Sequence, residues 1–320
     1  MTIRRSPVLL MLAGLACLTG LAPAPSAVAA SLEVTRDIGA DGEELLFHRP
    51  MAVVFAPDSS AYILNAGDCT ILHLSSDWKP LDRFGRMGEG PGEFSQPSGF
   101  ILHQGKLWVF DATRIVLFGL DGTYLETIHS GHELRLPALI EGDLFARLGA
   151  GERAAARLTS RGEIDLPIGP ECPTDDFFTR FRQCGLVEIL PHPKYLCVLV
   201  NAFQGDVMGI ADDGSVAETW KIPEGPGELK TTQNDEGMSM SLTMEFSIPM
   251  LDSRDRYWKL SHQEEDHSVI LLDSGFQATG ETVLVPEEIG AVRFAESPRG
   301  EIVALDGSAS AVYICRLVED

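Results

Sequence analysis

Apolar residues in this 320-residue chain occur in short runs rather than in long periodic stretches. The runs are rich in Val, Ile, Leu, Phe and Tyr, and turns of Gly, Asp, Ser and Pro separate them. They recur about every 8 to 12 residues, a spacing typical of consecutive β-strands, and hardly any segment has the period of an amphipathic helix. The pattern therefore predicts an all-β chain.

The segment 97–130 shows this pattern best, because four predicted strands at 99–103, 106–110, 115–120 and 123–128 follow one another through tight turns. The turn at Asp121 and Gly122 is a strong hairpin signal, since glycine accepts a positive φ. The run LWVF at 107–110 does not alternate strictly between apolar and polar residues. A sheet buried on both faces produces such a run.

The pentapeptide EGPGE occurs twice, at 89–93 and 224–228, an offset of 135 residues. That offset is about three units of 45 residues, and repeats of roughly 20 to 50 residues are typical of solenoids, arrays and propellers. Six units of three or four apolar runs each can be marked along the chain, at 51–86, 97–130, 136–169, 185–224, 245–286 and 289–317. The prediction is a six-bladed β-propeller of four-stranded antiparallel blades.

The glycines and proline of the pentapeptide suit a sharp passage from the outer strand of one blade to the inner strand of the next. Proline fixes φ, and glycine adopts conformations closed to other residues. The structural residues predicted for the two passages are Gly90, Pro91 and Gly92 in the first copy and Gly225, Pro226 and Gly227 in the second.

The last unit supplies only three strands, at 291–296, 301–306 and 311–317, while the run 32–38 near the N-terminus has no partner in its own unit. If this run becomes the fourth strand of the last blade, hydrogen bonds between the two ends of the chain close the ring. We predict this closure.

Residues 1–30 read as an export signal, leaving 31–320 as the propeller domain. Arg4 and Arg5 precede an apolar stretch at 7–21, and a small-residue cleavage site lies at 27–29. Glycines and a proline interrupt the apolar stretch, which disfavours a membrane anchor. Lipid attachment at Cys17 and twin-arginine export are minor alternatives. We expect a periplasmic or extracellular protein without stable membrane insertion after cleavage.

Loss of the signal removes two arginines and no acid, so 23 basic and 47 acidic residues give a mature net charge of −24. Such a surface repels nucleic acid and anionic lipid at long range. An unknown protein or a small neutral or cationic ligand remains as the expected partner. The simplest alternative is that the charge only keeps the protein soluble.

Five cysteines remain after cleavage, so at least one is unpaired. Cys172 and Cys184 bracket a segment that reads as a loop, and a disulfide between them would restrain it. That bridge and two free thiols are equally open alternatives. Cys69, Cys197 and Cys315 lie in apolar runs, where a buried thiol acting as a small hydrophobe is expected.

The segment 84–122 opens with FGRMGEGPGEFSQPSG at 84–99 and continues with the strands described above. In this order of motifs it resembles the NHL-repeat-like six-bladed β-propellers of bacteria. Their units commonly read FGxxGxGPGEFxxPxG, then an apolar strand, a strand ending in Asp, an Arg-Ile strand and a Gly turn. The matching residues are Phe84, Gly85, Gly88, Gly90, Pro91, Gly92, Glu93, Phe94, Pro97, Gly99, Val109, Asp111, Arg114, Ile115, Phe118 and Gly122.

Other units keep less of this motif. Unit one has Asn65 and Thr70 in the places of Asp111 and Arg114, unit six keeps Asp306, and units three to five depart almost completely. The resemblance implies the fold more firmly than an activity, because propellers serve as binding scaffolds and as enzymes alike. Many relatives look like exported binding proteins.

The predicted inner strands offer few ligands for a metal ion. None of them contains histidine, and only His48 lies beside one, so the convergent ligands that zinc needs are not expected. Carboxylates suit calcium better. Glu188, Glu245 and Glu296 lie in or beside inner strands and are the candidates, the alternative being solvated strand ends.

The insertion between units four and five carries Met238, Met240, Met244 and Met250. Thioethers can bind Cu(I), form an adaptable contact surface, or simply pack beneath a loop, and packing is the preferred interpretation. Long insertions of this kind are often functional. If the chain has a binding site, its candidate residues are therefore Met238, Met240 and Met244 together with Glu188, Glu245 and Glu296.

No motif for a catalytic nucleophile, a zinc protease or a phosphate-binding loop is present in the sequence. The expected function is thus an exported, non-catalytic binding or protein-interaction propeller without a resident cofactor. The alternative is a calcium-assisted, lactonase-like hydrolase or lyase with its site at the channel mouth.

Overall fold

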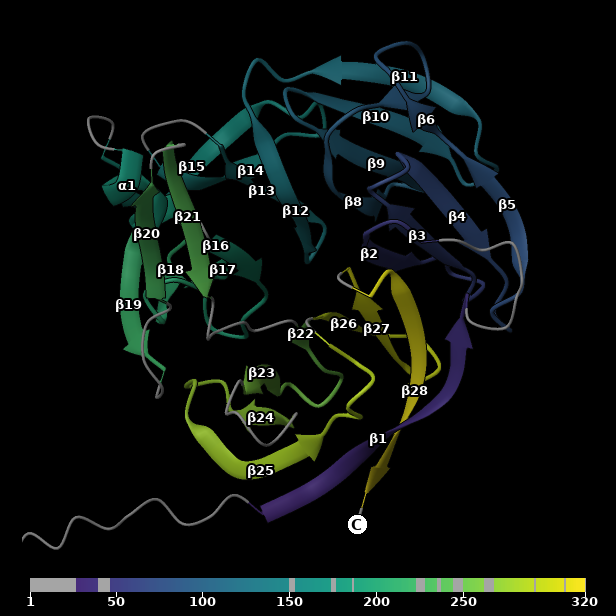
Figure 1. The fold of residues 1–320 in the computed structure, drawn as a ribbon. Coiled ribbons are helices and arrows are strands. Elements are labelled where there is room, and N and C mark those ends of the chain that lie inside the picture. The colour runs from purple at the N-terminus through teal and green to yellow at the C-terminus, as the bar shows by residue number, and fades with distance from the viewer. Residues whose placement is uncertain are drawn as a thin grey trace, which may run out of the picture.

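The structure, a computed structural model, describes residues 27–39, 47–149, 153–173, 177–185, 187–222, 228–234, 237–243, 250–261, 268–290, 292–307 and 309–319. Six four-stranded antiparallel blades form a ring, with the first strand of each blade nearest the axis (Figure 1). The predicted all-β, six-bladed architecture is confirmed.

The blades follow one another in chain order. Blade one comprises β2 (Pro50–Phe55), β3 (Ala61–Asn65), β4 (Thr70–Leu74) and β5 (Pro80–Phe84). Blade two comprises β8 (Pro97–His103), β9 (Lys106–Asp111), β10 (Arg114–Gly119) and β11 (Tyr124–His129). Blade three comprises β12 (Leu134–Ile140), β13 (Asp143–Leu148), β14 (Arg153–Leu158) and β15 (Ile164–Glu171).

The second half continues in the same way. Blade four comprises β16 (Val187–Leu190), β17 (Cys197–Asn201), β18 (Asp206–Ile210) and β19 (Val216–Lys221). Blade five comprises β22 (Met250–Leu251), β23 (Tyr257–Ser261), β24 (Ser268–Leu272) and β25 (Ala278–Leu284). Blade six comprises β26 (Val292–Glu296), β27 (Ile302–Asp306), β28 (Ala311–Glu319) and the N-terminal strand β1 (Ala27–Ile38).

Short elements lie between the blades. The passage from blade one to blade two forms the parallel pair β6 (Arg86–Met87) and β7 (Glu93–Phe94). The passage to blade four contains α1 (Phe177–Arg180) and a π-helical turn, η1 (Phe181–Gly185). The passage to blade five contains the hairpin β20 (Glu228–Asn234) and β21 (Gly237–Thr243). No helix of the described residues is long and apolar enough to cross a membrane.

The core consists of six apolar clusters, and each one fills the space between two neighbouring blades. Strand β9 shows why its apolar run is continuous. Leu107 and Val109 pack toward blade one, whereas Trp108 and Phe110 pack toward blade three. Because successive side chains of a strand point to opposite faces, a blade with two neighbours needs apolar residues at every position.

The ring closes as predicted. β1 pairs antiparallel with β28, in a register that runs from Ala30 opposite Glu319 to Ile38 opposite Val312. Leu32 is buried in the cluster between blades five and six, and Ile38 in the cluster between blades six and one. The closure therefore combines backbone pairing with burial on both faces.

β1 is longer than the predicted run 32–38, and its first residues also pair in parallel with β25 (Figure 1). The outer edge of blade five offers unpaired backbone groups there, and an adjacent strand satisfies them. The strand begins at Ala27, inside the predicted signal 1–30. Cleavage after residue 29 retains the pairs of Ala30 with Val283 and of Ser31 with Leu284.

Candidate functional site

The starts of the inner strands gather at one end of the axial channel and line two adjoining cavities. The mouth cavity has a volume of about 330 Å³ and is lined by Arg49, Met51, Ser95, Gln96, Pro97, Ser98, Arg135, Leu136 and Arg147. The channel cavity, of about 100 Å³, is lined by β2, β8, β12, β16 and β26. Met51, Ser98 and Leu136 line both cavities, which therefore adjoin each other.

Arginines dominate the charge of this region. Arg49 directly precedes β2, Arg135 is the second residue of β12, and Arg147 lies opposite Arg135 on β13. Opposite residues of an antiparallel pair share one face of the sheet, which brings Arg135 and Arg147 to the same cavity. Of the described residues that line the mouth cavity, none is acidic. The mouth is thus cationic in a chain of formal net charge −22.

Arg147 is the most enclosed of these arginines. Its Nη1 donates a hydrogen bond of 2.5 Å to the carbonyl of Gly185. Burial lowers the pKa of Arg147 to about 10, and the nearby charges of Arg135 and Arg293 also lower it. The guanidinium is still protonated at neutral pH. Arg135 is held by Glu133, whose Oε1 accepts from its Nε at 2.7 Å.

Glu188 is the predicted carboxylate that does line the channel. It is the second residue of β16, and its side chain is 23 % exposed, enclosed by the inner strands. Its Oε1 lies 4.0 Å from Nη2 of Arg293. Burial raises the pKa of Glu188, while the charges of Arg293 and Arg147 act in the opposite direction. The carboxyl group therefore faces arginines rather than other acids.

The raised pKa of Glu188 predicts a pH-dependent loss of stability. An acid whose pKa is higher in the folded state binds protons on folding, so the free energy of unfolding falls as pH rises from the ordinary glutamate pKa through the folded value. Glu188→Gln removes this ionisation. We therefore expect the free energy of unfolding of the variant, relative to that of wild type, to be higher at pH 7 than at pH 4. Urea denaturation at both pH values measures the difference, and an equal effect at both contradicts the prediction.

The other predicted carboxylates do not join Glu188. Glu296, at the end of β26, accepts hydrogen bonds of 2.7 Å from both N and Oγ of Ser253, and it lines neither cavity. Glu245 lies outside the described residues. Within the described ranges, no group of three or more His, Cys, Asp or Glu side chains is placed to hold a metal ion.

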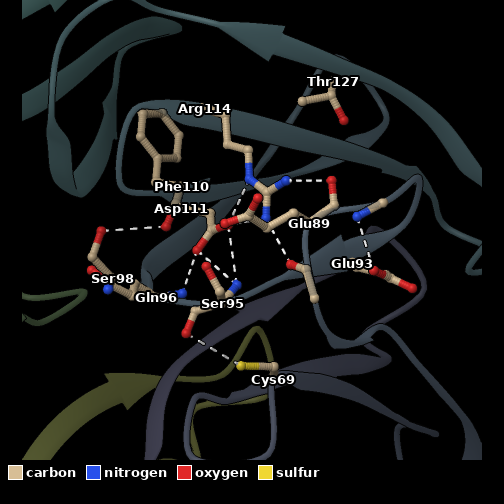
Figure 2. Close-up of polar contacts among 12 residues, drawn as sticks. Cys69, Glu89, Glu93, Ser95, Gln96, Ser98, Phe110, Asp111, Arg114 and Thr127 are labelled. Atoms are coloured by element: carbon tan, nitrogen blue, oxygen red, sulfur yellow. Dashed lines mark hydrogen bonds and ion pairs between the residues drawn. The ribbon is translucent and has the colours of Figure 1, made fainter.

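A buried polar network fixes the wall of the mouth cavity (Figure 2). Asp111, at the end of β9, accepts from the backbone N–H of Ser95 at 3.0 Å and of Gln96 at 2.5 Å. It also accepts from Nε of Arg114 at 2.8 Å, and Arg114 donates to two backbone carbonyls of the preceding loop, each at 2.8 Å. Since Ser95 and Gln96 line the cavity, the repeat-motif pair positions part of the site.

The first EGPGE copy makes the turn between the outer strand β5 and the inner strand β8. The N–H of Glu93 donates to the carbonyl of Gly90 at 3.0 Å, and Gly92 has a φ of 74°. The carboxylate of Glu93 accepts from the N–H of Gly90 at 2.8 Å and from Nε of Arg86 at 2.7 Å. In the second copy, Gly225, Pro226 and Gly227 lie outside the described residues.

Three other blades place a buried Asn or Asp where blade two has Asp111, at the end of the second strand. Asn65 accepts from the N–H of His48 at 2.8 Å, and Asp306 accepts from the N–H of Gly290 at 2.8 Å. Asn201 donates to two carbonyls of η1, both at 2.9 Å. Each contact reaches the segment that leads into the inner strand. Asn201 was not recognised from sequence, although it ends an apolar run as Asn65 does.

A disulfide joins Cys172 and Cys184. It lies in the passage between blades three and four, and Cys184 directly precedes Gly185, the acceptor of the Arg147 hydrogen bond. The bridge thus restrains the segment that holds Arg147. The three free cysteines of the described chain, Cys69, Cys197 and Cys315, are all buried. Burial raises the pKa of each thiol, and for Cys197 and Cys315 the pKa reaches about 12.

A larger cavity, of about 500 Å³, lies at the other end of the inner strands, between blades three, four and five. Its lining combines aromatic, basic and acidic groups, including Glu141, Asp143, His192, Lys194, Tyr195, Asp212 and Asp255. Lys194 pairs with Glu218, with Nζ 3.3 Å from Oε2. The two ends of the propeller therefore differ in charge, with carboxylates at this end and arginines at the mouth.

The methionine insertion falls in the passage between blades four and five. Met238 and Met240 belong to β21, but their side chains lie outside the described residues, as does Met244 entirely. Met250 opens β22 and is buried between blades five and six. For Met250, packing is what the structure shows.

No family model and no curated protein matches this sequence. Solved structures do match in fold. A Bacteroides fragilis protein, provisionally described as exported, has a TM-score of 0.58 at 10% identity, covering 93% of this chain and 97% of its own. Virginiamycin B lyase from Staphylococcus aureus has a TM-score of 0.54 at 10% identity, covering 90% and 100%. The WD40 domain of Neurospora crassa Pan2 has a TM-score of 0.52 at 12% identity, covering 90% and 94%. Because a lyase and an interaction domain match equally well, the likeness identifies a β-propeller fold and leaves the activity open.

Proposed function

We propose that this protein is an exported, non-catalytic binding propeller whose ligand site is the mouth cavity. The convergence of side chains from three blades on one cavity supports this function. Arg49 comes from blade one, Gln96 precedes blade two, and Arg135 belongs to blade three. The volume of about 330 Å³ falls at the lower end of the range for small-molecule sites.

Export rests on two observations. Residues 1–30 carry the predicted signal, and a Bacteroides fragilis protein of similar fold is provisionally described as exported. The similarity of the segment 84–122 to NHL-repeat-like bacterial propellers agrees with this placement. We propose the periplasm or the extracellular space as the site of action.

A binding function is preferred because the described residues of the mouth cavity offer the hydroxyls of Ser95 and Ser98 but no His, Asp, Glu or Lys to act as their base, and Glu188 in the adjoining channel cavity faces arginines. Nucleophilic and acid–base catalysis depend mostly on such groups. The competing function is the calcium-assisted hydrolase or lyase. Metal analysis of dialysed protein separates the two: a retained stoichiometric divalent ion favours the enzyme, and a metal-free, chelator-insensitive protein favours the binding function.

Occluding the mouth tests the proposed site. Met51 contacts both cavities, so Met51→Trp is expected to fill the passage between them. A thermal-shift panel of neutral sugars, amines and carboxylates should contain a compound that raises the Tm of wild type but not of Met51→Trp. Met87, 67 % exposed on β6, provides the matched control Met87→Trp, which should respond like wild type. Stabilising compounds that act equally on both variants would place the site elsewhere.

A further inference from the structure

We propose that the mouth cavity binds a small dicarboxylate, an inference that rests on the proposed function because it names the ligand class of the same site. The argument comes from the balance of charged side chains around the two cavities. Four arginines face two carboxylates, which leaves two positive charges: Arg49, Arg135, Arg147 and Arg293 against Glu133 and Glu188.

The two carboxylates are already engaged. Glu133 holds Arg135 through Nε at 2.7 Å, and Glu188 faces Arg293 at 4.0 Å. Among the described residues, the guanidinium of Arg49 has no hydrogen-bond or ion-pair partner. Arg147 donates a hydrogen bond to a neutral backbone carbonyl, and the charges of Glu133 and Glu188 reach it without forming an ion pair. Two guanidinium groups of the mouth cavity thus lack an acidic partner in the described part of the chain.

Like charges held close together repel, and the repulsion is felt most at Arg147, the buried member of the group, because it strengthens as water is excluded, whereas Arg49 is exposed at the opening. A dianion offsets that repulsion. Guanidinium groups bind carboxylates through paired N–H donors, and this geometry gives Arg its preference for such ligands. Arg49 and Arg147 enter the cavity from blades one and three, so each can hold a separate carboxylate group. A single phosphate would have to accept hydrogen bonds from both guanidinium groups while occupying one point of the cavity.

The acidic surface does not oppose a small ligand of this kind. Salt screens exposed charges beyond about 8 Å at physiological ionic strength. The net charge of −22 therefore acts against extended polyanions, which contact a wide surface, more than against a small dianion inside an arginine-lined cavity. Exposed Ser95 and Gln96 add neutral hydrogen-bond donors at the rim.

The test is titration calorimetry of the signal-free chain with succinate, its neutral analogue succinamide, and inorganic phosphate. We expect succinate to bind wild type, succinamide not to bind, and Arg49→Gln to weaken succinate binding at least tenfold. Arg147→Lys keeps the charge but removes the paired donors, and a several-fold loss is expected. Arg161→Gln, in an exposed turn between β14 and β15, changes the net charge equally and should bind like wild type.

The inference is overturned if succinate does not bind wild type, if Arg49→Gln binds it as tightly, or if succinamide or phosphate binds in its place. These results remain distinct from failure of the proposed function. A neutral or amine compound that loses its effect in Met51→Trp, with no succinate binding, sustains the mouth site and rejects the dicarboxylate. If succinate binds Met51→Trp and Arg49→Gln as tightly as it binds wild type, the mouth site and the dicarboxylate ligand are both rejected.

Discussion

Asp111→Ala is expected to lower the free energy of unfolding by about 3–5 kcal/mol, because it removes one partner of a buried ion pair. The side chains of Asp111 and Arg114 are only 1% and 12% exposed. Without Asp111, the charge of Arg114 is left uncompensated, and the N–H groups of Ser95 and Gln96 lose their acceptor. The same change releases the 95–96 segment, so ligand binding at the mouth should weaken as well.

Chemical denaturation of the variants measures this loss. Asp121, in the exposed hairpin turn of the same blade, accepts only from residue 123, and Asp121→Ala is expected to cost less than about 1 kcal/mol. The double variant Asp111→Ala, Arg114→Ala should lose less than the two single losses combined, because neither charge is then left alone. A loss in Asp111→Ala no larger than in Asp121→Ala would contradict the role assigned to the network.

The architecture could be predicted because every blade meets the same physical demands. Each needs four short strands with apolar residues on both faces, and the run LWVF at 107–110 records this demand directly. Ring closure followed from counting strands, since the last unit had three and the run 32–38 had no partner. The start of β1 at Ala27 could not be predicted, because it depends on the open edge of β25, which is distant in sequence.

The buried polar contacts of the blades could be predicted only in part from the sequence. Asp111 and Arg114 stood in a recognisable motif, whereas Asn201 makes a comparable contact in a blade that has lost the motif around it. In blade four the polar residue is recognised by its place at the end of the second strand, not by the residues around it. Aligning the ends of second strands, once the blades are numbered, would have found it.

The arginines of the candidate site were not predicted, because they come from distant parts of the chain, whereas Glu188 was a candidate and does line the channel cavity. Arg49, Arg135 and Arg293 become neighbours only when six inner strands surround one axis. The composition gives the sum of charge over the whole surface, and a few arginines at the axis hardly alter a net charge of −22. Glu188 was expected beside other carboxylates on that basis, whereas the fold places it beside arginines.

Val34→Cys is expected to form a disulfide with the native Cys315 and to stabilise the protein by about 2–4 kcal/mol. Val34 and Cys315 are directly opposite in the β1–β28 pair, and both contact the cluster between blades five and six. Opposite residues of an antiparallel pair have Cα atoms about 4.5–5.5 Å apart, within the range that a disulfide spans. The bridge would covalently link the two ends that close the ring.

Formation of this bridge should require refolding in a glutathione redox buffer, because burial raises the pKa of Cys315 to about 12 and the thiolate is the reactive form. Mass spectrometry of the non-reduced protein detects the loss of two hydrogens, and the difference in Tm with and without reductant measures the gain. Glu33→Cys is the matched control, since residue 33 lies opposite Arg316 and points to the other face of the sheet. A reduced Val34→Cys after oxidative refolding, or a bridge from residue 33 instead, would mean that the N-terminal strand does not close the ring in this register.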